Sequence, residues 1–167
     1  ASTPIENIQS WSARIESNTG FLPNRLAINR DVWYDLKNHP DIVDRVKHTS
    51  DRAVTTDLVA TLMGIDDVHV TGAARVTSAE GSTDVGAYIA GDDALLVYAP
   101  SSPGLMTPSG GYTFVWQGLI GSNQGQVIDR WRDDGRKSDM IRVTGAWAQK
   151  RIAPALGVFA NNVSTRA

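Results

Sequence analysis

The carboxylates best spaced for acid–base or metal chemistry occur as two adjacent pairs, Asp66–Asp67 and Asp92–Asp93. Paired carboxylates are typical of hydrolases and metal sites, but neighbouring residues of a strand point in different directions. Each pair would therefore need partners from distant parts of the chain. Because Asp92–Asp93 follows Gly91, and such a triplet is typical of a turn, we interpret both pairs as turn residues. A hydrolase that uses Asp92 or Asp93 is the last of the alternatives.

The other chemically versatile side chains also lack partners at useful spacing. Of the three histidines, His39, His48 and His69, none has the i, i+4 partner of a helical metal site. Cysteine is absent, and no serine lies in a Gly-x-Ser-x-Gly motif. The glycine-rich segment 118–125 lacks the Lys-Ser/Thr ending of a phosphate-binding loop. We therefore predict no enzyme, no catalytic residue, no cofactor and no metal.

A cluster of charges and a set of tryptophans are better suited to contacts than to catalysis. The cluster interleaves basic with acidic residues, which favours ion pairs within or between subunits over a nucleic-acid groove. Its members are Arg130, Arg132, Asp133, Asp134 and Arg136. Trp116, Trp131 and Trp147 could form a sugar-stacking platform, but burial in a core or interface is the favoured interpretation. A β-rich carbohydrate-binding module stays an alternative.

Periodicity predicts short helices first and strands afterwards, which is an α+β arrangement. A helix begins at Pro4, with Thr3 as N-cap and Glu6 completing a capping box, and stops near Gly20. A second helix, 32–38, has Asp31 as its cap. Further helices are expected at 41–47 and 56–63. Strands are expected at 25–29, 68–70, 75–77, 87–90, 94–99, 112–116, 127–131, 138–150 and 157–163, and the continuous apolar run 94–99 predicts burial on both faces.

Composition is that of an ordinary globular chain. It has 167 residues, 41% of them hydrophobic and 20% charged, with a net charge of −2. This balance argues against disorder and against a strongly basic nucleic-acid face. No apolar run approaches the ~20 residues of a membrane helix. The chain begins Ala1-Ser2-Thr3 and has no methionine before Met63, so we expect a processed or truncated product.

A series of short motifs follows in order along the chain. The motifs are PNRLAI at 23–28, DVW at 31–33, LKNHPDIVDRVK at 36–47, LMGI at 62–65, DALLVY at 93–98, PGLMTP at 103–108, GYTFVW at 111–116, KSDMIR at 137–142 and APALG at 153–157. Each motif is weak alone, but their joint order, from about Pro4 to Val163, resembles the second half of major capsid proteins of tailed bacteriophages.

This resemblance implies the Hong Kong 97-type capsid fold: a mixed β-sheet with short flanking helices, plus long C-terminal antiparallel strands. It implies an apical domain over residues 1–126 and strands returning to a peripheral domain over 127–167. The family's N-terminal arm, extended loop and spine helix have no counterpart here. The implied function is a structural coat subunit that forms pentamers and hexamers of an icosahedral shell around DNA. An encapsulin-like compartment shell is the alternative within this architecture.

The expected partners are copies of the same chain and a scaffolding protein, with no specific nucleic-acid site and no membrane. The expected location is the virion capsid, assembled in the host cytoplasm. Two loops are the candidate subunit contacts, because apical loops surround the capsomer axis in the family. Their candidate residues are Ser101, Pro103, Gly104, Met106, Pro108, Gly118, Ser122, Asn123 and Gln124. Alternatively these loops are connectors only.

Overall fold

The chain forms two structural units in a computed structural model that describes residues 3–47, 54–104, 106–116, 118 and 125–164. The first unit comprises Ala1–Gly110 and Ala153–Ala167, and the second comprises Gly111–Ile152. The chain therefore leaves the first unit once and returns to it. These limits differ from the predicted division at residue 126, and the assignment of apical and peripheral domains stays a prediction.

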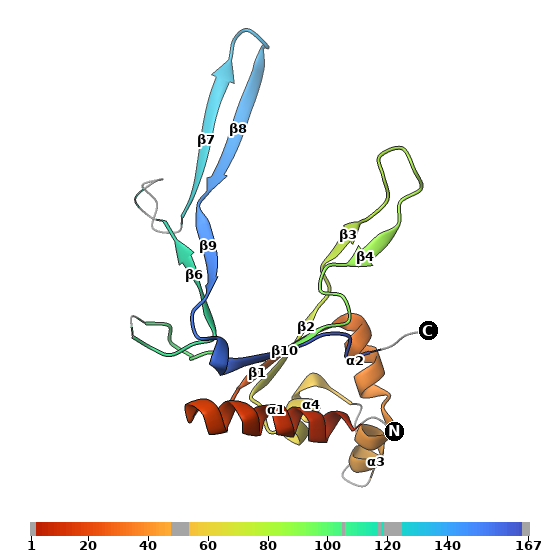
Figure 1. Cartoon of the computed structure of the whole chain (residues 1–167). Helices are drawn as coiled ribbons and strands as arrows, with labels where there is room; N and C mark the ends of the chain where they lie inside the picture. Colours follow the sequence, from red (N-terminus) through yellow and green to blue (C-terminus); the bar gives the residue numbers. More distant parts are fainter. Residues whose placement is uncertain (1–2, 48–53, 105, 117, 119–124, 165–167) are drawn as a thin grey trace. The chain divides into compact units, whose positions relative to one another are not determined.

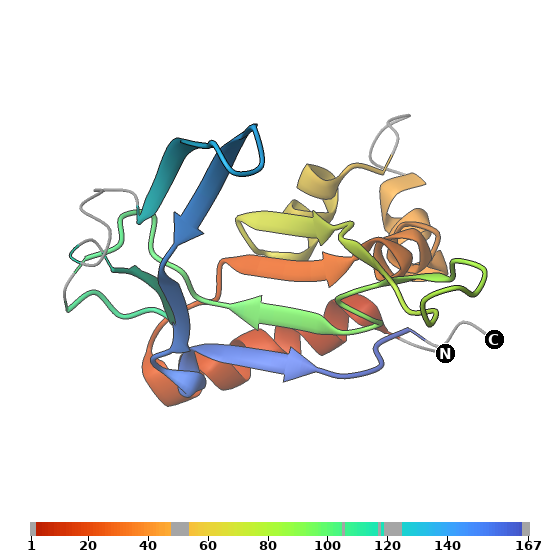
Figure 2. The same cartoon turned by 90° about the horizontal axis from the view of Figure 1, so that it is seen from above.

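The first unit is built on a four-stranded mixed sheet, seen from above in Figure 2. Its strands lie in the order β10 (Gly157–Ala160), β5 (Ala94–Val97), β1 (Arg25–Asn29) and β2 (Asp67–Thr71). Strand β1 runs parallel to β2 and antiparallel to β5, which is also antiparallel to β10. The sequence-based expectation of an α+β fold with a mixed sheet is thereby confirmed.

Four helices accompany this sheet: α1 (Pro4–Thr19), α2 (Arg30–Lys37), α3 (Pro40–Lys47) and α4 (Thr56–Met63). Helix α1 crosses one face of the sheet (Figure 1). It ends at Gly20, which has a φ of 74°, and α4 ends at Gly64, which has a φ of 70°. These left-handed conformations favour glycine because a Cβ atom would be strained there.

One predicted helix cap is correct in position only, and the other is wrong. Thr3 is the N-cap residue of α1, and its backbone carbonyl accepts the first hydrogen bond of the helix from the Asn7 amide, but its side chain makes no capping hydrogen bond. Helix α2 begins one residue before Asp31, and its N-cap is Asn29, whose side chain accepts from the Arg30 amide at 2.6 Å. Asn29 is both the last residue of β1 and the cap, so the strand passes directly into the helix and leaves no separate capping residue.

The core lies between the helices and one face of the sheet. Cross-strand neighbours Leu26, Val68 and Leu96 are all buried on this face, where Ile5 and Ile15 of α1 are also buried. Leu95 and Phe159 are paired on the opposite face and are 38% and 62% exposed. The expectation that the apolar run 94–99 is buried on both faces is wrong, because helices cover one face only.

Two short strands, β3 (Ala74–Val76) and β4 (Gly86–Tyr88), form an antiparallel hairpin in the first unit. Most of its residues are exposed, including Val76 and Val85. The 3₁₀ helix η1 (Pro154–Leu156) precedes β10, and Leu156 is buried.

The second unit is a two-stranded β-ribbon, here called the ribbon. One side comprises β6 (Gly111–Val115) and β7 (Gln126–Asp133), and the other comprises β8 (Ser138–Gly145) and β9 (Trp147–Arg151). Strand β7 pairs with β8, and β6 pairs with β9. Ala146 joins the two ladders, because its carbonyl accepts from the Trp116 amide and its amide donates to the Gly125 carbonyl. The predicted strand 138–150 is therefore interrupted at Ala146.

Candidate functional site

The described residues contain no cluster of His, Asp or Glu arranged to hold a metal ion. Asp92 and Asp93 lie in a turn after Gly91, which has a φ of 58°, and Asp93 accepts a hydrogen bond from the Asn162 amide. The turn predicted for Asp92 and Asp93 is confirmed.

His69 is exposed, whereas the preceding residue, Val68, is buried. The Nε2 atom of His69 lies 3.1 Å from Asp67 Oδ2 and 3.1 Å from Arg25 Nη1. No described helix is long and apolar enough to cross a membrane.

The strands β7 and β8 of the ribbon carry an exposed apolar surface. Residues that pair across an antiparallel ladder share a face. Ile128 pairs with Val143 and Arg130 with Ile141, so the three apolar side chains lie on one face, here called the apolar ribbon face. Their exposed fractions are 62–65%. A two-stranded sheet has no interior of its own, so this face is buried only when other polypeptide covers it.

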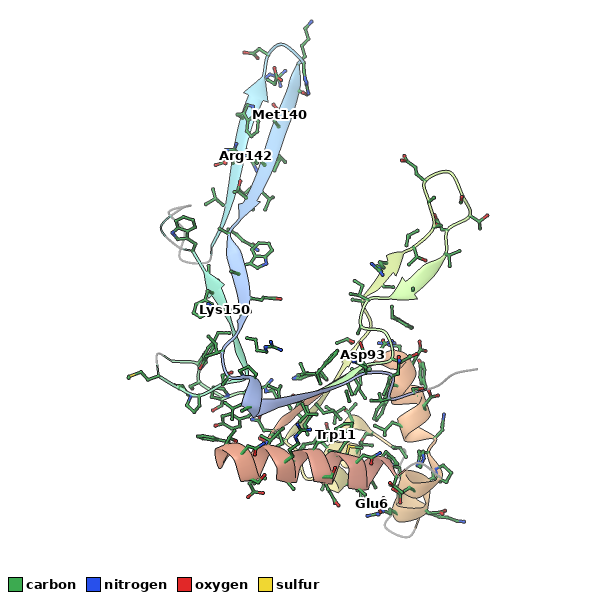
Figure 3. All side chains as sticks on the ribbon, in the orientation of Figure 1. Glu6, Trp11, Asp93, Met140, Arg142 and Lys150 are labelled. Atoms are coloured by element: carbon green, nitrogen blue, oxygen red, sulfur yellow. The ribbon has the colours of Figure 1, made fainter. Side chains whose placement is uncertain are left out.

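The opposite face of the same strands combines an ion pair with aromatic and apolar side chains. The Arg142 guanidinium donates to Asp129 Oδ2 through Nη2 at 2.7 Å and through Nε at 3.1 Å. It also lies over the Trp131 ring, 5.6 Å from its centroid. Met140 pairs with Trp131 across the ladder. Figure 3 shows Met140 and Arg142 on the β8 side of the ribbon.

The predicted charge cluster lies at and near the end of this ribbon. Arg132 contacts Asp134 at 3.5 Å and Asp139 at 3.0 Å, and Arg136 contacts Asp133 at 3.8 Å. Ion pairs therefore form within the hairpin, which is one of the two arrangements predicted, within a subunit or between subunits. Arg130 has no ion pair among the described residues, and a role of the cluster between subunits stays a prediction.

The three tryptophans of the predicted sugar platform do not share one face. Trp116 continues the face of Phe114, because its amide bonds to Ala146, whereas Trp147 pairs with Val115 on the other face. They are 62% and 60% exposed, and Trp131 is 45% exposed. The favoured interpretation is burial in a core or an interface, and its first alternative is wrong because a two-stranded ribbon provides no core. Burial in an interface stays a prediction.

In the described part of the first candidate contact loop, the Met106 side chain is strongly exposed. Met106 is 99% exposed, whereas the next most exposed large apolar side chain among the described residues is at 65%. Met106 also has a φ of 77°, a conformation that non-glycine residues rarely adopt. The loop also contains Leu105, which lies outside the described residues, and otherwise only serine, threonine, proline and glycine, among them Ser101, Pro103, Gly104 and Pro108. In the second candidate loop Gly118 is exposed, and Ser122, Asn123 and Gln124 lie outside the described residues.

The first unit also contains an open cavity of about 550 Å³. Ile8 and Trp11 of α1 line it, together with Val32 of α2 and Ala94 at the start of β5. Polar groups lie at its margin, among them Asp35, which accepts a hydrogen bond from Ser164. Figure 3 shows Trp11 between α1 and the sheet. Sequence reasoning missed this cavity because its lining comes from four separate segments.

The first unit has a helix-covered mixed sheet, and the second unit is a two-stranded ribbon with exposed apolar side chains, a combination typical of proteins that contact other polypeptide. No family model matches the chain. The chain is 26% identical, over 168 aligned positions, to the major capsid protein of Burkholderia phage BcepMu, covering 98% of this chain and 51% of that protein.

A crystal structure of a phage-related protein from Bordetella bronchiseptica RB50 has a similar fold. The TM-score is 0.80 at 25% identity, over 95% of this chain and 50% of that one. This chain thus spans about half the length of both proteins. The resemblance to phage major capsid proteins, inferred above from ordered motifs, is confirmed by these similarities.

Proposed function

We propose that this chain is part of a structural coat subunit of a tailed bacteriophage, with the Hong Kong 97-type fold. In this role it associates with copies of itself into pentamers and hexamers, which form an icosahedral shell around DNA. The subunit acts in the virion capsid, after assembly in the host cytoplasm and in contact with a scaffolding protein.

The observation that carries this proposal is the apolar ribbon face, taken together with the similarity to a phage major capsid protein over nearly the whole chain. Ile128, Ile141 and Val143 contribute exposed apolar area to a ribbon that has no interior. Exposed apolar surface of this kind marks contacts with other polypeptide. In a shell, neighbouring subunits provide such polypeptide.

The two rival functions receive less support. A carbohydrate-binding platform requires aromatic rings on a common face, and Trp116 and Trp147 lie on opposite faces of the ribbon. A hydrolase requires partners around Asp92 and Asp93, and the described residues offer a turn with a backbone hydrogen bond. Assembly requires neither feature.

Electron microscopy of the protein, expressed at its full natural length with any scaffolding protein, tests the proposal. Closed icosahedral shells are expected, and their absence under all assembly conditions would overturn it. Shells that enclose DNA in infected cells support the phage coat. Shells that enclose one protein cargo and no DNA identify the encapsulin-like alternative.

A further inference from the structure

We propose that the β3–β4 hairpin of one subunit covers the apolar ribbon face of a neighbouring copy, with Asp84 of the hairpin paired to Arg130 of the ribbon. This inference rests on the proposed function, and it names the partner of the ribbon. Three observations carry it: an unpaired cation within the apolar ribbon face, an exposed apolar hairpin face that carries a carboxylate, and opposite net charges on the two units.

The apolar ribbon face contains a cation. Arg130 lies two residues after Ile128 on β7 and pairs with Ile141 of β8, so its side chain shares their face. It is exposed, and it has no ion pair among the described residues. Any polypeptide that covers the apolar side chains also removes the guanidinium group from water. Because an unpaired buried charge costs a large free energy, the covering surface must bring a carboxylate.

A second ribbon does not bring that carboxylate. Two apolar ribbon faces packed on each other would place two Arg130 side chains in one interface, where like charges repel each other. Asp139 is the acidic residue of the ladder that shares this face, because it pairs with Arg132. Its Oδ1 atom already lies 3.0 Å from the Arg132 guanidinium group. The partner of the apolar ribbon face is therefore a different surface.

The β3–β4 hairpin presents an apolar side chain and an unpaired carboxylate together. Val76 is 60% exposed and pairs with Gly86. The Thr77 amide donates to the Val85 carbonyl at 2.8 Å, so the pairing continues one step beyond the strands. Alternation then places Asp84 on the face of Val76. Asp84 is exposed and has no ion pair within the described part of the chain, and Figure 1 shows the hairpin projecting from the sheet of the first unit.

The two units carry opposite net charges. The second unit, Gly111–Ile152, contains seven basic and four acidic residues, a net charge of +3, whereas the first unit contains nine basic and fourteen acidic residues, a net charge of −5. The hairpin segment 77–86 has Glu80 and Asp84 and no basic residue. Between copies, a ribbon is therefore attracted to a first unit and repelled by another ribbon. Such a contact between two different surfaces is heterologous, and it closes into rings when the rotation permits.

Charge reversal tests the Arg130–Asp84 pair in the protein expressed at its full natural length. Arg130→Asp and Asp84→Arg are each expected to lower particle yield by about tenfold or more, because like charges then meet in the contact. The double variant Arg130→Asp/Asp84→Arg is expected to recover the yield to within about threefold of wild type, since the charges are again opposite. The matched control, Arg130→Asp/Glu16→Arg, has the same net charge but reverses an exposed carboxylate of α1, and its yield should stay low.

Cysteine cross-linking tests the contact independently, because the chain has no cysteine of its own. Assembled particles of Val76→Cys/Ile141→Cys are expected to give disulfide-linked oligomers under mild oxidation. Thr144 is exposed on the opposite face of β8, so the control Val76→Cys/Thr144→Cys is expected to link about tenfold less. Ile141→Cys alone should not link, since two apolar ribbon faces do not meet.

The inference is overturned if wild-type particles form but the double charge reversal stays at the yield of the single variants. It is also overturned if the Ile141 pair links no better than the Thr144 pair, if Ile141→Cys links alone, or if the disulfide forms within one chain. These results leave the proposed coat function intact, whereas failure of the wild-type protein to form particles at all contradicts the coat function itself.

Discussion

Asn24 and Ala99 exchange two hydrogen bonds across 75 residues of sequence, with the asparagine amide in the place of a backbone peptide group. The Asn24 carbonyl also accepts from the Asp66 and Asp67 amides, at 3.1 Å each. One residue therefore joins the start of β1 to the start of β2 and to the segment after β5. Register at this end of the sheet depends on it.

Replacement of Asn24 by alanine is expected to destabilise the first unit by about 2–3 kcal/mol, because two partly buried hydrogen bonds are lost and the Ala99 groups stay unpaired. Urea denaturation followed by circular dichroism measures the change. Asn38→Ala, which removes one exposed bond to the Tyr34 carbonyl, is the control and should cost less than about 1 kcal/mol. Equal costs for the two variants would contradict the role of Asn24.

The cap of α2 allows a direct comparison of Asn29 with Asp31. Asn29→Ala removes a buried capping group and is expected to cost about 1–2 kcal/mol. Asp31→Ala lies within the first turn, where its charge contributes only about 0.3–1 kcal/mol through the helix dipole. Thermal unfolding of both variants checks this order. A larger loss for Asp31 would restore it as the principal cap.

The ribbon ion pair between Asp129 and Arg142 is expected to contribute little to stability. Their side chains are 39% and 64% exposed, and exposed pairs contribute about 0–1 kcal/mol. A double-mutant cycle with Asp129→Asn and Arg142→Gln, at low and high salt, measures the coupling energy. It should be small and should decrease with salt, because solvent ions screen exposed charges. A coupling above about 2 kcal/mol would indicate burial in an interface.

The apolar ribbon face is expected to matter for association rather than for folding. In the triple variant Ile128→Thr/Ile141→Thr/Val143→Thr, threonine keeps the β propensity but removes apolar area. The unfolding midpoint of the unassembled subunit should change little, while particle yield should decrease by at least tenfold. Val127→Thr, on the opposite face, serves as control. Unchanged assembly of the triple variant would exclude this face from the subunit contacts.

Gly64 tests whether backbone conformation alone ends α4. Nothing lies within 4 Å of a Cβ atom at this position, so Gly64→Ala creates no clash. With a φ of 70°, however, alanine is expected to cost about 1 kcal/mol. Chemical denaturation measures this. Gly86→Ala is the control, since that position also has open space but no positive φ.

Local signals in the sequence determined most of the elements. Apolar periodicity located α1 and α4, and glycines at positions 20 and 64 ended them, because only the backbone and near neighbours are involved. The ordered motifs also sufficed to indicate a phage capsid protein, which the comparisons support.

Only the tertiary structure decided which apolar residues are covered. The run 94–99 is uniformly apolar, yet Leu96 is buried and Leu95 is not, since helices pack on one face of the sheet. Trp116 and Trp147 are exposed because their strands form a ribbon without a second layer. The Asn24–Ala99 hydrogen bonds and the lining of the cavity near Trp11 both involve segments that are distant in sequence. Contacts between distant segments leave no periodic pattern within either segment, so the sequence alone does not reveal them.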